Sequence, residues 1–204
     1  MIRTGITGGI GSGKSTICKC WRDLGAYVVN SDQLAKELMV QDSRLREEIR
    51  FHFGTKAYKQ DGSLNRHYLA RAAFREGRVE ELNRLVHPVL KREIQSLIEV
   101  AESEGHPMFV QEAAILLNNG RPGYLDYVVL VRAEKSRRMM WVAERDSMSE
   151  ADVEARMGAQ SSDEDLQPLC DYIIENNSTK NELIRKAEEL YRTIIHHREP
   201  SRKA

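Results

Sequence analysis

The chain has 204 residues and a mass of 23.4 kDa, which suits one compact α/β domain with a small inserted subdomain. Lys plus Arg and Asp plus Glu each number 31, so the formal net charge is zero and no cationic surface for nucleic acid is expected. Hydrophobic residues make up 41% of the chain, which argues against disorder, and no apolar stretch is long enough to predict a membrane partner.

The cysteine content predicts a reducing environment. Only Cys18, Cys20 and Cys170 are present, and an odd, sparse set argues against a disulfide framework. No clustered histidine joins them, so a zinc site is not expected. The first residues form a strand pattern rather than a basic leader followed by an apolar stretch. We therefore expect a cytoplasmic protein with reduced thiols.

Short apolar runs predict the strands. Most are continuous rather than alternating, which is typical of parallel strands buried on both faces. The predicted strands are Ile2–Thr7, Tyr27–Asn30, Met108–Gln111, Tyr127–Val131 and Tyr172–Ile174. Helical patterns lie between them, so the sequence predicts an α/β fold with a doubly wound, mostly parallel five-stranded sheet.

The helical patterns follow the strands in chain order. The first has Ile17, Trp21 and Leu24 on one face, and Gly25 is expected to end it. A long pattern over residues 82–98 contains Pro88, which would bend or divide the helix. Two later helices are expected to open with capping boxes, formed by Ser149 with Asp152 and by Thr179 with Glu182.

The strongest motif is Gly8-Gly9-Ile10-Gly11-Ser12-Gly13-Lys14-Ser15, which matches G-x-x-x-x-G-K-[ST] in full. An apolar strand precedes it and an amphipathic helix follows, so an incidental glycine-rich turn is the weaker alternative. Such a loop aims backbone N–H groups at the phosphates of a nucleoside triphosphate. Lys14 would reach the β- and γ-phosphates and Ser15 would ligate Mg²⁺. The expected nucleotide-binding residues here are Gly9, Ile10, Gly11, Ser12, Gly13, Lys14, Ser15 and Thr16.

Two polar residues follow strands and each allows two interpretations. Asp32 comes just after the second strand, where its carboxylate could orient or deprotonate a substrate hydroxyl. It could equally cap a helix beginning at Gln33, and both roles can hold at once. Asn176 follows the last strand, where it could hydrogen-bond an adenine ring or serve as a turn residue.

These motifs resemble those of the dephospho-coenzyme A kinase family. The resemblance begins with the residues from Gly5 to Ser15 and covers nearly the whole chain, to about Ile195. The ordered set is more specific than the phosphate loop, which many families share. The further matches, in chain order, are Leu24–Ala26, Asn30–Ala35, Phe53-Gly54, Asp61–Arg66, Leu82-Asn83, His87-Pro88, Glu112–Leu117, Arg145-Asp146, Gln160 and Asp171–Asn176.

The resemblance implies transfer of the γ-phosphate of ATP, with Mg²⁺, to the ribose 3′-hydroxyl of dephospho-CoA. This is the final step of coenzyme A synthesis, with small-molecule substrates only. It implies that Lys14, Asp32 and Arg145 act in catalysis, with Arg145 closing over the phosphates from a lid. Without the resemblance, Arg145 and its cationic neighbours would be assigned to a solvated helix face.

The resemblance also implies three parts within one domain. The nucleotide-binding core would comprise about 1–40, 106–135 and 166–195, a helical CoA-binding insertion about 41–105, and the lid about 136–165. Arg66, Arg71 and Arg84 are candidates in the insertion for the acceptor's pyrophosphate, and the sequence does not choose among them.

Three positions depart from the usual family pattern. Asn30 stands where the family usually has the first of two acids, although the second is kept as Asp32. Asn118 replaces an acid after the third strand, where Glu112 could serve, and Trp141 stands where an arginine is common. Two alternatives therefore stay open: a P-loop kinase for a nucleoside, nucleotide or small alcohol, and a nucleotide-binding switch.

Overall fold

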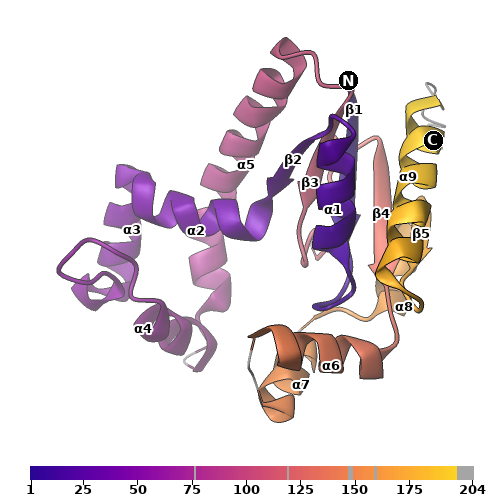
Figure 1. Ribbon diagram of the computed structural model, residues 1–204. Coiled ribbons are helices and arrows are strands. Elements are labelled where there is room, and N and C mark those ends of the chain that lie inside the picture. The colour runs from indigo at the N-terminus through magenta and orange to yellow at the C-terminus, as the bar shows by residue number, and fades with distance from the viewer. Residues whose placement is uncertain (76, 119, 147–148, 159, 197–204) are drawn as a thin grey trace. The chain divides into compact units, whose positions relative to one another are not determined.

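The computed structural model describes residues 1–75, 77–118, 120–146, 149–158 and 160–196 (Figure 1). Its contacts divide the chain into two compact units. The first comprises Met1–Asn30 together with the chain from Ala101 onward, and the second comprises Ser31–Val100. Each unit has its own hydrophobic core.

The first unit is built on a sheet of five parallel strands, which confirms the expected fold class. The strands are β1 (Ile2–Thr7), β2 (Tyr27–Asn30), β3 (Met108–Glu112), β4 (Tyr127–Arg132) and β5 (Tyr172–Glu175). Their order is β2-β3-β1-β4-β5, so β1 lies between β3 and β4. β3 is buried throughout, whereas the edge strands β2 and β5 are partly exposed. In such a sheet ligands bind at the carboxyl ends of the strands, beside the central strand where the order reverses.

Helices of the first unit flank this sheet. They are α1 (Lys14–Asp23), α6 (Lys135–Asp146), α7 (Glu150–Gly158), α8 (Asp163–Leu166), a 3₁₀ turn (Gln167–Leu169) and α9 (Lys180–His196). α1 and α9 pack together, and the indole Nε1 of fully buried Trp21 donates a hydrogen bond of 2.8 Å to the Ala187 carbonyl. Gly25, with φ +98°, follows the end of α1 as expected.

Both predicted N-cap residues accept a hydrogen bond from the amide three residues further on, which is one half of a capping box. The Ser149 hydroxyl accepts from the Asp152 amide at 3.2 Å, and the Thr179 hydroxyl accepts from the Glu182 amide at 3.3 Å. Each bond satisfies a backbone donor that a helix start leaves free. These local signals therefore locate the starts of α7 and α9.

The second unit is helical in its described residues. It contains α2 (Ser31–Gln41), α3 (Ser43–Phe53), a 3₁₀ turn (Thr55–Ala57), α4 (Arg66–Ala70), a π-helical turn (Arg71–Arg75) and most of α5 (Val79–Ser103). Leu45, Ile49 and Phe53 of α3 are buried in its core with Leu69 and Val86. Pro88 does not divide α5, which continues through it.

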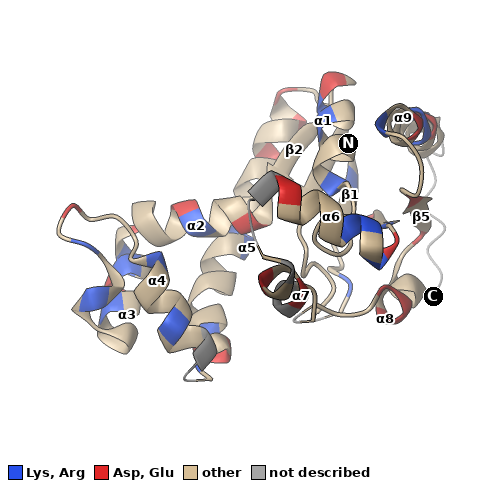
Figure 2. Ribbon diagram, turned by 60° about the horizontal axis from the view of Figure 1, so that its bottom comes forward, with Lys and Arg blue, Asp and Glu red and all other residues tan. Residues whose placement is uncertain are grey.

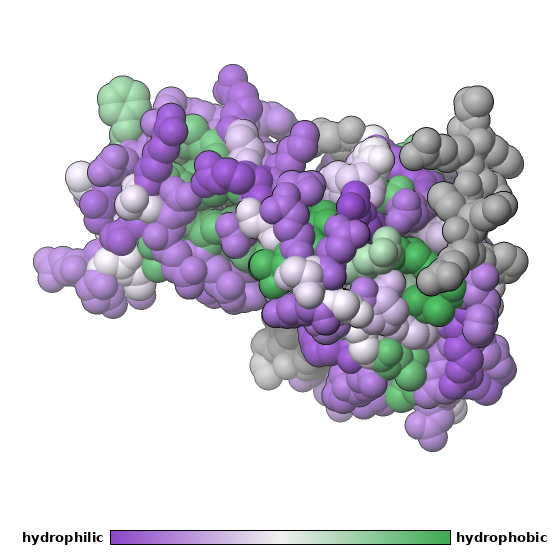
Figure 3. Space-filling view, turned by 90° about the horizontal axis from the view of Figure 1, so that it is seen from above, coloured by the Kyte–Doolittle hydropathy of each residue, from purple (hydrophilic) through white to green (hydrophobic). Residues whose placement is uncertain are grey.

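The surface mixes charges of both signs. Figure 2 shows Lys and Arg interspersed with Asp and Glu, as the zero net charge suggests. Figure 3 shows a mostly hydrophilic surface on which hydrophobic residues form small groups. Among the described residues, no helix has the length and apolar character needed to cross a membrane.

Candidate active site

The glycine-rich loop joins β1 to α1 at the carboxyl end of the central strand. Gly8 and Gly13 have φ values of +137° and +104°, in a region that glycine adopts most readily. A Cβ at Gly8 would also lie 2.0 Å from the Val131 carbonyl oxygen of β4. Gly8 is therefore required both by its backbone conformation and by the close approach of β4, and Gly13 by its backbone conformation.

Lys14 lies against this loop. Its side chain is buried, and its Nζ donates hydrogen bonds of 2.7 and 3.0 Å to the carbonyl oxygens of Gly8 and Gly9. The next residue, Ser15, is exposed in the first turn of α1. That turn contains no acidic residue and the Gly13 N-cap makes no side-chain cap bond, so its positive end is suited to an anion.

Asn176 holds the loop from the end of β5. Its side-chain Nδ2 donates a buried hydrogen bond of 2.9 Å to the Ser12 carbonyl. A Cβ at Gly13 would lie 2.6 Å from the same nitrogen, so Asn176 packs directly on the loop. Neither role that the sequence predicts for Asn176, an adenine contact or a turn residue, includes this hydrogen bond. It joins segments far apart in the chain, and no motif signals it.

Gln160 accepts a hydrogen bond from one of the loop amides. The Ile10 N–H donates to Gln160 Oε1 at 2.8 Å, although the sequence assigned Ile10 to phosphate binding. Gln160 entered the sequence analysis only through the family resemblance. In this structure Gln160, two residues beyond the end of α7, therefore contacts the loop directly through its side-chain carbonyl.

A small polar cluster lies at the carboxyl ends of β2 and β3. Asn30 Nδ2 donates to Glu112 Oε2 at 3.0 Å, and Glu112 is only 8% exposed. Burial raises the pKa of the Cys18 thiol well above its ordinary value, and the hydrogen bond that Glu112 accepts from the thiol adds to this. Glu112 therefore links the end of β2 to α1, one turn beyond Lys14.

Asp32 belongs to the second unit, where it is exposed in the first turn of α2. This helix begins at Ser31 rather than Gln33, so the alternative that Asp32 is the N-cap is wrong. An acid in the first turn still interacts favourably with the helix dipole. Arg145 belongs to α6, but its side chain is outside the described part of the structure.

Within the described ranges, no group of three or more His, Cys, Asp or Glu side chains could hold a metal ion. Mg²⁺ bound with a nucleotide does not need such a cage, because phosphates and waters supply most of its ligands. The exposed Ser15 hydroxyl at the end of the loop fits this kind of site.

Comparisons with known proteins agree on one family. The family model for dephospho-CoA kinase matches residues 2–182. Two curated proteins named dephospho-CoA kinase align over most of their length. The protein from Salinibacter ruber is 43% identical over 192 residues, which are 94% of this chain and 96% of that one. The protein from Corynebacterium diphtheriae is 36% identical over 188 residues, covering 92% and 94%.

Solved structures share the fold of this chain. TT1252 from Thermus thermophilus matches with a TM-score of 0.78 and 30% identity, over 95% of this chain and 97% of that one. A dephospho-CoA kinase from Campylobacter jejuni matches with a TM-score of 0.62 and 21% identity, over 94% and 96% of the two chains. At that identity the second match supports the fold alone.

Proposed function

This chain belongs to the dephospho-CoA kinase family, and we propose which role each site residue has in that family's reaction. The protein uses ATP to phosphorylate dephospho-CoA at the ribose 3′-hydroxyl, which yields coenzyme A. The family match over residues 2–182, with the phosphate loop intact, is the observation that carries this conclusion. Neither another small acceptor nor a nucleotide switch is favoured.

We propose that the loop from Gly9 to Thr16 binds the phosphates of ATP. Lys14 supports this role because its ammonium already lies on the loop and can exchange two carbonyl partners for phosphate oxygens. Ser15 would hold Mg²⁺, and the ion would neutralise phosphate charge. Glu112 is a buried carboxylate that contacts Cys18, one turn further along α1 than Lys14. We propose that it accepts hydrogen bonds from the water ligands of the ion.

In the proposed reaction the acceptor's 3′-oxygen attacks the γ-phosphorus in line. The new O–P bond forms as the bond between that phosphorus and ADP breaks. Asp32 orients the 3′-hydroxyl and accepts its proton. Arg145 neutralises charge from the lid, as the family resemblance implies.

We assign Asn176 to positioning the loop. Its bond to the Ser12 carbonyl supports this role rather than the adenine contact expected from sequence. We also propose that the chain divides into a nucleotide-binding core, a helical CoA-binding insertion and a lid. Cys18, Cys20 and Cys170 are free thiols, which supports the proposed cytoplasmic location.

The Asp32→Asn variant tests the acceptor side. Replacing the carboxylate with an amide removes the proton acceptor and preserves shape, so turnover should fall roughly 10²- to 10⁴-fold. The dissociation constant for ATP, measured by calorimetry, should stay close to that of the wild type. Glu37→Gln, another exposed acid on α2, is the matched control and should leave turnover unchanged. Equal turnover in both variants would remove Asp32 from the mechanism.

A further inference from the structure

α6 lies directly on the phosphate loop, at Gly11. A Cβ there would lie 2.9 Å from the Arg138 carbonyl oxygen and 2.8 Å from Val142 Cγ2. Val142 is fully buried, so this approach is a packed contact. Figure 2 shows that the beginning of this helix is cationic, and its first turn contains Lys135, Arg137 and Arg138. Gly11 therefore allows the first turn of α6 to lie close to the loop at Arg138.

The Arg138 side chain continues this contact onto Gly9. A Cβ at Gly9 would lie 1.8 Å from Arg138 Nη1 and 3.0 Å from its Cζ, so the guanidinium approaches the glycine end-on through Nη1. Among the described residues, Arg138 Nε is buried without a hydrogen-bond partner. Such a buried, unpaired donor is costly unless a ligand satisfies it.

The charges around Arg138 do not supply that partner. Asp163 in α8 lies near enough for the Arg138 charge to oppose the rise in the Asp163 pKa that burial causes. Among the described contacts, no hydrogen bond or ion pair joins these two residues. By contrast Arg137, the next residue on the same helix, lies 3.7 Å from a Glu134 carboxylate oxygen.

A side-chain oxygen lies near the same glycine that Arg138 approaches. Gln160 Oε1 accepts the Ile10 N–H at 2.8 Å, and it lies 3.6 Å from the same Gly9 Cβ position that Arg138 Nη1 approaches. An oxygen acceptor therefore already sits on a loop amide beside the guanidinium. A phosphate oxygen suits both donors better than a neutral carbonyl, because charge-assisted hydrogen bonds are stronger.

We propose that Arg138 binds the phosphate chain of ATP beside Gly9 and Ile10, in the position that the Gln160 carbonyl oxygen now marks. Arg138 then contacts substrate directly and is a phosphate ligand that sequence analysis left unassigned. The inference rests on the proposed function only in that ATP occupies the loop. It does not depend on the identity of the acceptor.

The test compares Arg138→Met, Arg138→Lys and the matched control Arg137→Met. Methionine keeps an unbranched apolar stem on Gly9 but removes the guanidinium. We expect Arg138→Met to weaken ATP binding about 10- to 100-fold by calorimetry and to raise the KM for ATP similarly. The KM for dephospho-CoA should stay unchanged. Arg138→Lys should recover part of the loss because it keeps the charge without the planar fork, and Arg137→Met should behave as the wild type.

ATP affinity in Arg138→Met equal to that of Arg137→Met would overturn the proposal. A lower Tm in Arg138→Met with unchanged ATP affinity would do the same, because it would assign Arg138 to packing alone. ATP binding is measured without acceptor. A wild-type protein that binds ATP but leaves dephospho-CoA unmodified would therefore contradict the proposed function while this comparison still decides the role of Arg138.

Discussion

At the scale of single residues, Asn30 changes the electrostatics at the end of β2. It donates a 3.0 Å hydrogen bond to Glu112, which is nearly buried. An aspartate at this position would face that carboxylate across the same short distance. Two carboxylates so close cannot both ionise at low cost, and one pKa would rise. An amide at position 30 avoids this repulsion and donates a hydrogen bond to Glu112 instead.

Asn30→Asp is expected to make the free energy of unfolding depend on pH. The raised pKa means that the folded state binds more protons than the unfolded state. Stability should therefore fall as pH rises from about 4 through the raised pKa. Thermal unfolding between about pH 4 and pH 8 measures this, with Asn30→Ala as the uncharged control. A pH profile that matches the control would contradict the geometry of the pair.

Residue-level prediction from sequence succeeded only where the signal is local. The loop from Gly8 to Ser15 is a contiguous motif, and the structure places it between a strand and a helix as predicted. The bonds from Asn176 to Ser12 and from Ile10 to Gln160 join distant segments, so no spacing rule could reveal them. Trp141 stands where the family commonly has an arginine, but only the structure shows Arg138 one turn earlier against Gly9.

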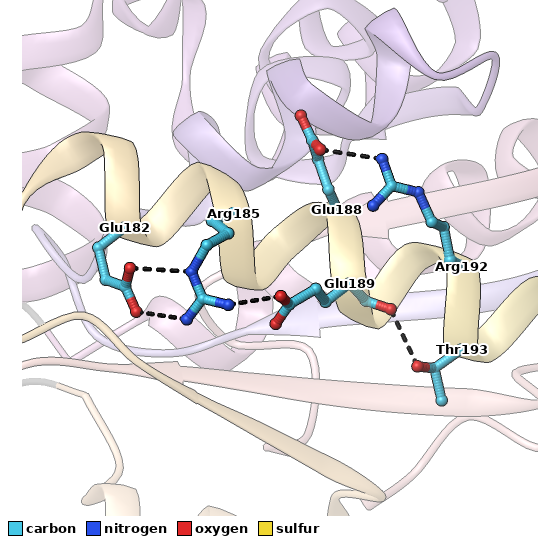
Figure 4. Close-up of polar contacts among 6 residues, drawn as sticks. All are labelled: Glu182, Arg185, Glu188, Glu189, Arg192 and Thr193. Atoms are coloured by element: carbon cyan, nitrogen blue, oxygen red, sulfur yellow. Dashed lines mark hydrogen bonds and ion pairs between the residues drawn. The ribbon is translucent and has the colours of Figure 1, made fainter.

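At the scale of elements, α9 has one face that is buried and one face that is solvated. Its inner face buries Leu183, Ala187, Tyr191 and Ile194. Figure 4 shows the outer ion pairs, in which Arg185 bridges Glu182 and Glu189 and Arg192 pairs with Glu188 at 3.0 Å. Exposed pairs of this kind contribute little and weaken with salt. The packing of α9 on α1 therefore carries most of its stabilising effect.

The Trp21→Phe variant tests that packing. It removes buried volume and the hydrogen bond to the Ala187 carbonyl. The free energy of unfolding should fall by about 1–3 kcal/mol in urea titrations. Arg185→Ala, on the solvated face of α9, should change the midpoint only slightly, and less at high salt. A larger loss for Arg185→Ala than for Trp21→Phe would contradict this division.

A second element-level prediction concerns the start of α5. Hydrogen bonds from Arg78, and then from His52 of α3, lower the Glu81 pKa from 4.5 to about 2. A depressed carboxyl pKa stabilises the fold above the unfolded value, and this stabilisation is lost as pH falls from 4.5 through about 2. Wild-type stability should therefore decline more steeply over that window than that of Glu81→Gln. Glu80→Gln, an exposed neighbour in the same helical turn, should retain the wild-type slope.

Elements were more predictable than contacts. β1 and β2 match their predicted bounds, and the other strands extend one residue further. The strands could be predicted because a strand that is buried on both faces appears in the sequence as a continuous apolar run. The start of α2 was misplaced because Ser31 and Asp32 both favour helix starts. Pro88 does not divide α5, whose apolar residues pack into the second unit's core on both sides of the proline.

At the scale of the whole molecule, the balance of charge shapes the expected partners. The chain has 31 cationic and 31 acidic residues, and the two signs are interspersed in its described part, so we expect no long-range positive field that would attract a polyanion. We therefore expect no measurable binding to duplex DNA at about 0.15 M salt in a fluorescence anisotropy titration. Tight binding that weakens steeply with salt would contradict this expectation.

The central claim is that this chain transfers the γ-phosphate of ATP to dephospho-CoA. The most direct measurement incubates the protein with ATP, Mg²⁺ and dephospho-CoA, and analyses the acceptor by mass spectrometry while ADP is quantified. We predict that the acceptor gains one phosphate and becomes coenzyme A, with one ADP released for each product molecule. ADP release without a phosphorylated acceptor, or ATP binding with no turnover of dephospho-CoA, would contradict the claim.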